Sequence, residues 1–400
     1  MSPRSDLTPL GHHEKRFWTR DDAVPAGGRK AGTYRVFIPA TIAEWEFAFS
    51  GDAAEALAEA TGALSRLQDD PLHRPSLKLA RSLLRSESAA SSRIEGKQAS
   101  QKTLARAAYD RDHGRRADRR AAEVLGNVEA MERAIAIGAS SARLKRADLL
   151  DIHRTLLRFT EDEAIAGVLR QEQSWIGGND HHPIGAPYVG PPWELVPGLM
   201  DDLCAFMQRT DLPGVAQAAI AHAQFENIHP FVDGNGRVGR ALIYTVLRRR
   251  GQLGEDVPPV SLVLGAQPRN YIAGLGAYSG GHVGLWCERF AGAVSRAAGE
   301  TGRLAGAIAS LQAEFLGRIG PLRSDAAARD IVAALPDHPL LDVASMQEVT
   351  GKSHVTVGRA IAQLQGAGIL RPLNERRWGR AWECAELLQV VEDFERSVAA

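Results

Sequence analysis

Cysteine is scarce in this chain of 400 residues, which has only Cys204, Cys287 and Cys384. Three widely separated thiols cannot form a disulfide framework, and they are typical of buried free cysteines in a reducing compartment. No cysteine and histidine cluster has the spacing of a zinc site. Residues 1–30 also lack the apolar segment of a signal peptide. We therefore expect a cytoplasmic protein with a loose leader over 1–34.

Net charge and long apolar runs are absent as well. Lys+Arg and Asp+Glu number 48 each, so no overall field attracts the chain to nucleic acid, and any such attraction must come from a local patch. No apolar run reaches the length of a membrane span, and we expect no membrane partner. A chain of this length usually divides into two or three domains.

The most informative segment runs from His229 to Arg240 and reads His-Pro-Phe-Val-Asp-Gly-Asn-Gly-Arg-Val-Gly-Arg. Its glycines let the backbone approach a ligand, and N–H groups at the start of a helix form an anion site that the helix dipole strengthens. We expect that helix over 236–250, where Arg237 and Arg240 lie near one face and can hold successive phosphates. Asp233 is placed to carry Mg²⁺ against the same phosphates. His229 can act as a general base on a hydroxyl.

This segment resembles the defining motif of the Fic family, His-Pro-Phe-x-Asp-Gly-Asn-Gly-Arg-x-x-Arg, and it fills every specified position. Members transfer a nucleoside monophosphate, usually AMP from ATP, to a Ser, Thr or Tyr hydroxyl of a protein target. The resemblance implies that His229 deprotonates that hydroxyl and that Asp233 binds Mg²⁺. It also implies that Arg237 and Arg240 hold the β- and γ-phosphates of ATP. The other nucleotide-binding residues that we expect in the motif are Gly234, Asn235, Gly236 and Gly239.

A second segment, Ser91-Ser92-Arg93-Ile94-Glu95-Gly96, resembles the inhibitory-helix motif of the same family. That motif is Ser or Thr, three residues, Glu, and then Gly or Asn, and Ser91, Glu95 and Gly96 fill it. The resemblance implies that Glu95 pairs with Arg240, which deprives the γ-phosphate of its counter-charge and prevents productive ATP binding. Without the resemblance, the segment is an ordinary helix C-terminus with Gly96 as its stop.

The spacing of apolar residues predicts a mainly α-helical protein, with one short extended piece at 34–39. Helices are expected over 53–68, 76–95, 101–111, 117–137, 146–158, 195–209, 215–228, 236–250, 284–297 and 300–317. The stretch 35–145 resembles the helical N-terminal region that accompanies Fic cores and carries the inhibitory helix. The core itself is expected over 146–320.

The segment 167–192 is the least helical part of this core. Gly-Gly and Pro-Pro punctuate two short apolar pieces, Trp175-Ile176 and Tyr188-Val189, which indicates a β-hairpin. It resembles the family's flap, which holds the target segment by strand addition. We expect Tyr188 and Val189 to line the nucleotide, and Tyr271 to border its base as a matching Tyr does in relatives. The alternatives are an ordinary surface hairpin and a Tyr271 that only packs in the core.

Residues 323–400 resemble a winged helix-turn-helix. Three short helices are expected over 324–335, 343–350 and 353–367, followed by a two-stranded wing from Leu370 to Leu388. In many regulators this module places its third helix in the major groove of DNA.

On that reading, the third helix would face the bases and the wing would contact phosphates. The residues expected there are Ser353, His354, Thr356 and Arg359 on the helix and Arg376, Arg377 and Arg380 on the wing. Because the third helix carries few basic residues, a winged helix that docks on a protein is an equal alternative.

The sequence thus leaves several functions open. The first is an autoinhibited adenylyltransferase that uses ATP and Mg²⁺ and modifies a protein target, with the C-terminal module selecting or locating targets. The second is a DNA-binding regulator whose Fic core senses nucleotide or modifies the chain itself. A third, within the enzyme class, is removal of AMP with Glu95 orienting water. The target, the direction of the reaction and the choice between monomer and homodimer are not fixed by the residues.

Overall fold

The computed structural model describes residues 8–20, 23–25, 28–69, 79–115, 118–140, 142–158, 160–254, 256–321, 326–373 and 380–399. This part of the chain is mainly α-helical, as the sequence predicts. It forms two compact units, each assembled from separate segments of the chain. The first comprises Met1–Thr61, Glu129–Gln252 and Pro268–Gly292, and the second comprises Gly62–Val128, Leu253–Gln267 and Ala293–Ala400.

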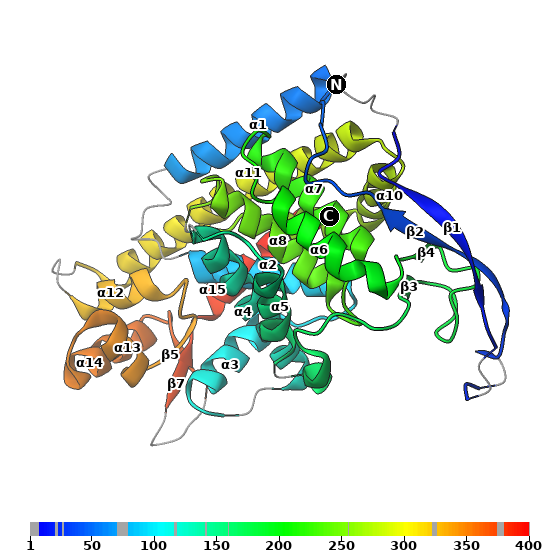
Figure 1. Cartoon of the computed structure of the whole chain (residues 1–400). Helices are drawn as coiled ribbons and strands as arrows, with labels where there is room; N and C mark the ends of the chain where they lie inside the picture. The colour runs from blue at the N-terminus through cyan, green and yellow to red at the C-terminus, as the bar shows by residue number, and fades with distance from the viewer. Residues whose placement is uncertain are drawn as a thin grey trace. The chain divides into compact units, whose positions relative to one another are not determined.

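A central helix, α7 (Gly214–Ile228), organises the first unit (Figure 1). It is rich in alanine and buried on nearly every face, so neighbouring helices approach it closely. The helices around it in this unit are α5 (Arg146–Leu157), α6 (Val196–Phe206), α8 (Asn235–Arg249) and α10 (Pro268–Ser279). Two short 3₁₀ helices, Glu161–Ile165 and Trp193–Leu195, lie near the two ends of the segment between α5 and α6.

Two small antiparallel hairpins complete the first unit. The strands β3 (Trp175–Ile176) and β4 (Tyr188–Val189) pair with each other, which confirms the predicted hairpin. The strands β1 (Gly11–Trp18) and β2 (Gly32–Pro39) form a longer hairpin that begins inside the predicted loose leader, so that expectation is wrong for residues 11–18. Strand β1 is largely polar and exposed, so it lacks the apolar alternation by which a half-buried strand is recognised.

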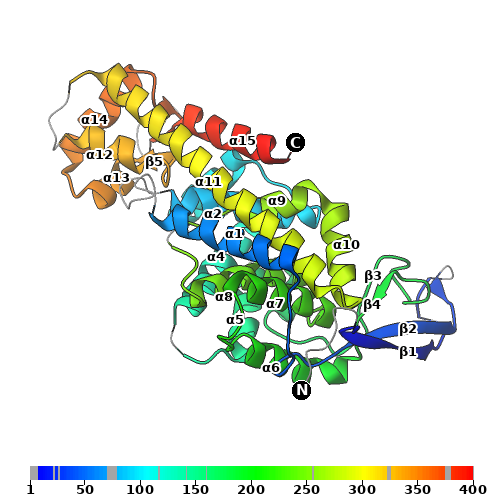
Figure 2. The ribbon, with the colours of Figure 1, turned by 90° about the horizontal axis from the view of Figure 1, so that it is seen from above.

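The longer hairpin lies beside the shorter one in both views (Figure 2). Aromatic side chains join them: the ring centroids of Trp18 and Trp175 are 5.8 Å apart, and those of Phe37 and Tyr188 are 6.3 Å apart. The hairpin over residues 175–189 is therefore supported by packing that comes from the N-terminal residues.

The second unit contains α2 (Ala80–Ile94), which is buried along most of its length. Its Glu87 carboxylate accepts hydrogen bonds from the main-chain N–H of Ser261, at 2.8 Å, and from the Ser261 hydroxyl. These bonds satisfy donors at the start of the short helix α9 (Val260–Ala266). Helix α3 (Gln101–Asp112) follows α2 and begins at the N-cap Ser100.

Three helices extend through residues of both units: α1 (Gly51–Asp69), α4 (Arg119–Ala139) and α11 (Val283–Ile319). The 37-residue α11 corrects the prediction of two helices over 284–297 and 300–317. The expected break fell at Gly299, but one glycine costs a helix interior only about 1 kcal/mol. Among the described residues, every helix is too short or too polar to cross a membrane.

The C-terminal part of the second unit contains α12 (Ala327–Ala334), α13 (Val343–Thr350) and α14 (His354–Gly366), near the three predicted positions. Three strands, β5 (Leu340–Asp342), β6 (Arg371–Pro372) and β7 (Ala381–Glu383), form one sheet in the order β5-β7-β6. The two predicted wing strands are confirmed, because β6 pairs with β7; the sequence did not predict β5, whose three residues are too short to show a strand pattern. Arg376 and Arg377 lie outside the described residues.

The predicted wing, which ran to Leu388, extends too far at its C-terminal end. Helix α15 (Ala385–Ala399) begins where the wing was expected to continue to Leu388. Its buried residues Leu387, Leu388, Val391 and Phe394 recur at three and four positions, which is a helical spacing. Glu395 on this helix accepts hydrogen bonds from Arg93 Nη2 at 3.2 Å and Gln101 Nε2 at 2.5 Å, so α15 is anchored to α2 and α3.

A polar cluster joins α3 to β5 and predicts a pH-dependent stability. Asp342 accepts hydrogen bonds from the Tyr109 hydroxyl at 2.9 Å and the Ser345 N–H at 2.8 Å, and its Oδ2 lies 2.7 Å from His113 Nε2. Burial raises the pKa of Asp342, but these donors outweigh burial and hold it below its ordinary value. The stabilisation is then present above the unfolded-state pKa of about 3.9 and is lost as pH falls through the lower folded-state pKa.

We expect Asp342→Asn to lower the free energy of unfolding by about 1.5–3 kcal/mol at neutral pH, the value of hydrogen bonds to a charged group. The difference from the parent should shrink as pH falls below about 4. Urea denaturation at a series of pH values measures this. A difference that stays constant down to acid pH would show that the charge of Asp342 does not stabilise the fold.

Candidate active site

His229 lies immediately after the last residue of α7 and has a left-handed conformation, with φ 48° and ψ 61°. Within the described residues it is the only residue other than glycine with positive φ. Its N–H donates to the carbonyl of Phe225 at 2.9 Å, which ends the helix. The conformation costs a residue with a side chain about 1–2 kcal/mol, so surrounding contacts must hold it.

The loop between α7 and α8 is closed by the side chain of Asn235. Its Oδ1 accepts from the Phe231 N–H and its Nδ2 donates to the Phe231 carbonyl, both at 2.8 Å. The amide therefore fixes the loop, while the main chain of the same residue opens α8. The N–H groups of Asn235, Gly236 and Arg237 precede the first hydrogen bond of the helix, from Val238 N to Gly234 O at 3.0 Å. These are the groups that form an anion site at a helix N-terminus.

Gly234 is needed at the turn for two reasons. Its φ is 81°, which disfavours a side chain, and a Cβ there would lie 2.9 Å from Leu156 and 3.4 Å from the ring of His153. His153 in turn lies 3.0 Å, through Nε2, from the carbonyl of Asp233, and its Nδ1 accepts from the Gly167 N–H at 2.9 Å. Burial lowers the pKa of His153 to about 4, so it is neutral at physiological pH.

The arginines of the motif lie on α8 as predicted and are almost fully buried, at 0% and 2% exposure for Arg237 and Arg240. Arg237 Nη2 donates to Asp233 Oδ2 at 2.7 Å. Burial, and then the charge of nearby Arg240, lower the pKa of His222 to about 3. His222 Nε2 is 2.8 Å from the Tyr271 hydroxyl, so a neutral histidine connects Tyr271 to the neighbourhood of Arg240.

Gly239 faces α7 rather than the loop. A Cβ at this position would lie 2.4 Å from Glu226 Oε1 and 3.2 Å from His222 Nδ1. Gly239 thus permits close packing of α7 on α8, and its expected role toward the nucleotide stays a prediction.

The predicted flap residues have structural partners of their own. The Tyr188 hydroxyl donates to the carbonyl of Asn227, two residues before His229, and Val189 is 4% exposed. Tyr271 is also buried, and its hydroxyl contacts His222. The roles of Tyr188, Val189 and Tyr271 in lining a nucleotide stay predictions.

Glu95 and Ser91 belong to the second unit. Glu95 is the C-cap of α2, with φ −94° and ψ 13°, and Gly96 follows with φ 78°, so the helix stops where the sequence predicts. Ser91 is fully buried on α2. The predicted pairing of Glu95 with Arg240, which lies in the first unit, stays a prediction.

The side chains near the glycine turn can be compared with those that usually bind Mg²⁺. Within the described residues no group of three or more His, Cys, Asp or Glu side chains is arranged to hold a metal. Mg²⁺ bound to nucleotides commonly needs only one or two carboxylates, with phosphates and water completing the shell. The Asp233 side chain is 42% exposed beside the N-terminus of α8, which suits such a ligand.

Sequence reasoning missed three side chains that hold this site: His153, His222 and Arg170. His153 and His222 are buried on helices, and a lone buried histidine gives no pattern by itself. Arg170 lies in the segment 167–192 outside the two predicted strands, and its Nε donates to the carbonyl of His229 at 2.8 Å. Burial lowers its pKa to about 10, so it remains charged at neutral pH.

A histidine next to an anion site and two buried arginines, at one junction of two helices, is a site built for phosphate chemistry. Comparison with known proteins places these residues in a known family of domains. Residues 143–247 match the model of the Fic/DOC family, and residues 51–136 match that of the Fic/DOC family N-terminal region. These matches identify a Fic/DOC domain over residues 143–247 and a Fic/DOC N-terminal region over residues 51–136.

Curated relatives are consistent with these matches. The chain is 35% identical over 148 residues to "Protein adenylyltransferase Fic" of Drosophila virilis, a match that covers 34% of this chain and 26% of that protein. It is 34% identical over 158 residues to the protein of the same name in Drosophila yakuba, covering 37% and 27%. The chain thus spans about a quarter of the length of these relatives.

A Fic family protein from Desulfovibrio desulfuricans has a similar fold. The TM-score is 0.53 at 23% identity, and the match covers 84% of this chain and 97% of that one.

Proposed function

We propose that this protein is an adenylyltransferase that moves AMP from ATP to a Ser, Thr or Tyr hydroxyl of a protein target. One observation carries the proposal: every specified residue of the motif folds into a single junction, with His229 at the end of α7 and the glycine turn opening α8. The name of the Drosophila relatives supports the same activity.

The proposed step is a substitution at phosphorus. The target hydroxyl oxygen attacks the α-phosphorus of ATP while His229 takes the hydroxyl proton. The bond from the α-phosphorus to the oxygen that bridges to the β-phosphate breaks, and pyrophosphate leaves. The N–H groups that open α8, together with Arg237 and Arg240, hold the phosphates. Asp233 would hold Mg²⁺, which when bound neutralises charge on the leaving group.

Asp233→Ala should leave the fold intact and weaken turnover at low Mg²⁺, because the variant lacks the carboxylate assigned to the ion. Arg237 loses its 2.7 Å partner in this variant, so Asp233→Asn, which can still accept a hydrogen bond, separates the two roles. Initial rates measured across a Mg²⁺ titration show whether either variant has lost Mg²⁺ dependence. A variant with the parental Mg²⁺ dependence would remove Asp233 from metal binding.

The proposal includes inhibition by Glu95. Its carboxylate competes with the γ-phosphate of ATP for Arg240, so the resting enzyme binds ATP unproductively. Support for this role comes from the match of Ser91, Glu95 and Gly96 to the family's inhibitory motif and from the position of Glu95 at the C-terminal end of α2.

For residues 323–400 we propose a docking module of the winged-helix type. The order α12, β5, α13, α14, β6, β7 supports it. Ser353 caps α14, and His354, Thr356 and Arg359 are exposed on that helix, so they are available to DNA or to a protein target. Arg380 lies 5.4 Å from the ring centroid of Trp382, beside the expected wing.

Removing residues 323–400 is not a clean test, because α15 anchors α2 through Glu395. We expect Arg359→Glu instead to change the set of labelled proteins or to abolish DNA binding, with self-labelling unchanged. Arg289→Glu makes the same charge change at an exposed position of α11 and should alter neither. Gel patterns from lysate and salt-dependent DNA binding measure the two outcomes. If Arg359→Glu and Arg289→Glu behave alike, α14 is not the docking surface.

The overall proposal is tested by incubating the Glu95→Gly protein with lysate and ATP labelled in its α-phosphate. Labelled protein bands support the transferase, whereas a chain that labels nothing and binds DNA with a strong salt dependence supports the regulator. Loss of label from a pre-modified target, faster with parent than with Glu95→Gly, would support removal of AMP.

A further inference from the structure

Arg170 donates to three consecutive carbonyl groups around the proposed base. It is 2% exposed and lies between the first 3₁₀ helix and β3. Its main-chain N–H donates to Pro230 O at 3.0 Å, Nε to His229 O at 2.8 Å and Nη2 to Ile228 O at 3.4 Å. The last carbonyls of a helix have no partner inside the helix, and the Arg170 guanidinium supplies a donor to the last carbonyl of α7, that of Ile228.

The same guanidinium also holds the flap, which we define as the hairpin β3 and β4 with the residues at its ends. Nη1 donates to Glu172 O and Nη2 to Pro191 O, both at 2.7 Å, and these carbonyls lie at the two ends of the flap. A guanidinium is planar and its donors have fixed directions. One rigid group therefore sets the position of both flap ends relative to the carbonyl of His229.

Gly190 shows how close the three parts are. A Cβ added there would lie 3.0 Å from Ser174 Oγ, 3.4 Å from Arg170 Nη2 and 3.8 Å from His229 Cβ. The end of the flap, the guanidinium and the histidine are thus in mutual contact range, with no space for another side chain between them.

We infer that Arg170 is a positioning residue that fixes the flap relative to His229, and thereby places a flap-bound hydroxyl within reach of the base. This inference rests on the proposed function, in which the flap holds the target. His229 needs such support because its left-handed conformation is intrinsically unfavourable. A displacement of about 1 Å between reacting groups can cost about 10²-fold in rate.

Arg170→Lys tests the inference in the Glu95→Gly background. Lysine keeps the positive charge but lacks the planar fork, so it cannot hold all the carbonyls at once. We expect the turnover number for AMP transfer to fall by about 10²-fold while the dissociation constant for ATP stays at the parental value. Loss of ATP binding in parallel with turnover would show a general structural role and overturn the inference.

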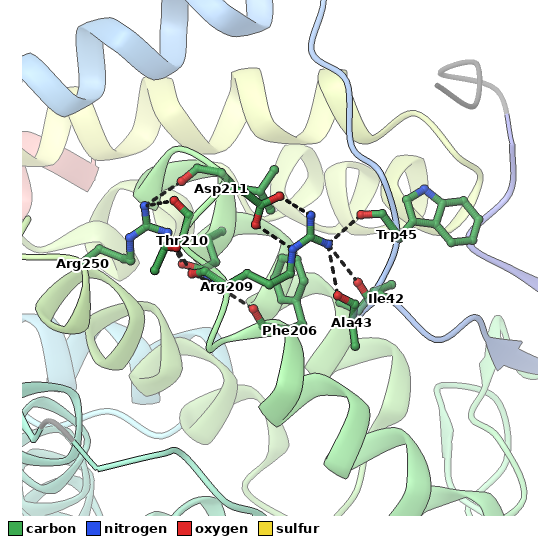
Figure 3. A network of polar contacts seen from close by, with 10 residues as sticks. Ile42, Ala43, Trp45, Phe206, Arg209, Thr210, Asp211 and Arg250 are labelled. Atoms are coloured by element: carbon green, nitrogen blue, oxygen red, sulfur yellow. Dashed lines mark hydrogen bonds and ion pairs between the residues drawn. The ribbon is translucent and has the colours of Figure 1, made fainter. Parts of the chain in front are cut away.

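Arg250→Lys is the matched control, because Arg250 is an arginine of the same unit with a similar set of acceptors. Its Nη1 donates to Arg209 O at 3.1 Å and its Nη2 to Leu212 O at 2.8 Å, at the C-terminal end of α8 (Figure 3). We expect the thermal stability of Arg250→Lys to decrease about as much as that of Arg170→Lys. We expect its turnover number to stay at the parental value. An equal loss of turnover in both lysine variants would contradict a specific role for Arg170.

A second variant keeps Arg170 in place. Gly190→Ala adds a methyl group at the end of the flap, and that position does not require glycine for its φ. It should lower turnover and leave ATP binding unchanged, because the added methyl group must displace the end of the flap relative to the Arg170 guanidinium. Parental turnover in Gly190→Ala together with a folded, fully active Arg170→Lys would exclude the positioning role.

A structural readout separates failure of this inference from failure of the proposed function. NMR resonances of His229 and amide hydrogen exchange of Ile228 and His229 report the contacts of Arg170 with this turn, whether or not AMP is transferred. We expect both to change in Arg170→Lys and not in Arg250→Lys. If Glu95→Gly protein transfers no AMP but these changes occur, the proposed function fails and the positioning contacts of Arg170 stand. Unchanged resonances and exchange in Arg170→Lys would overturn the positioning role of Arg170.

Discussion

His229→Ala protein should transfer AMP about 10²–10⁴-fold more slowly than its parent, the usual cost of losing a general base. A neutral hydroxyl is a weak nucleophile, and in the proposed step His229 takes its proton. Because the residue follows the last turn of α7, its substitution leaves the packing of that helix unchanged. Alanine must still adopt positive φ at this position, and Arg170 can still donate to its carbonyl, so the main chain of the site is expected to be retained.

The rate should be measured as initial label incorporation at saturating ATP in the Glu95→Gly background. His282→Ala is a control with the same chemical change at an exposed position before α11, and it should retain the parental rate. Parental labelling by His229→Ala, with the His282→Ala control also active, would mean that another group removes the proton. The chemistry assigned to the motif would then be wrong.

Glu95→Gly should raise labelling by about 10–100-fold, the scale of a charge-assisted contact of about 1.5–3 kcal/mol. Removal of the carboxylate frees Arg240 for the γ-phosphate without changing His229 or Asp233. The variant should fold, because Glu95 is a C-cap rather than a residue inside the helix. Glu95→Gln removes the charge and keeps the side-chain size, so it should activate to a similar extent if charge is the cause.

Arg240→Ala should not reproduce this gain, since it removes the partner of the inhibitor and of the phosphate together. Combined with Glu95→Gly, it should abolish the activation. Label incorporation in the four proteins of this double-mutant cycle measures the coupling. Equal labelling by parent and Glu95→Gly, or an activation that persists without Arg240, would contradict inhibition through this pair.

The sequence predicts the local parts of the structure well. The end of α7 and the start of α8 follow from the order of His229, Gly234 and Asn235, because a turn of this kind is specified by adjacent residues. The flap strands were also predicted, since Gly-Gly and Pro-Pro delimit them. The C-terminal end of α2 is similarly determined by Gly96, which has positive φ.

The parts that the sequence did not predict depend on distant residues. Strand β1 has no apolar alternation and is defined by pairing with β2 about 20 residues later, a pairing that local propensity does not encode. Arg170 reaches carbonyls 58 to 60 positions away in the sequence, and no motif records which carbonyl an arginine will contact. His153 stacks on Phe231 with ring centroids 3.7 Å apart, another contact created only by folding.

The central claim is that the His229 motif transfers AMP to protein rather than phosphate. The most direct measurement incubates Glu95→Gly protein with ATP labelled either in the α-phosphate or in the γ-phosphate, and compares the label retained on protein. Our account predicts label from the α-phosphate only, and none when His229→Ala is added. Protein label from the γ-phosphate, or α-phosphate label that survives His229→Ala, would contradict it.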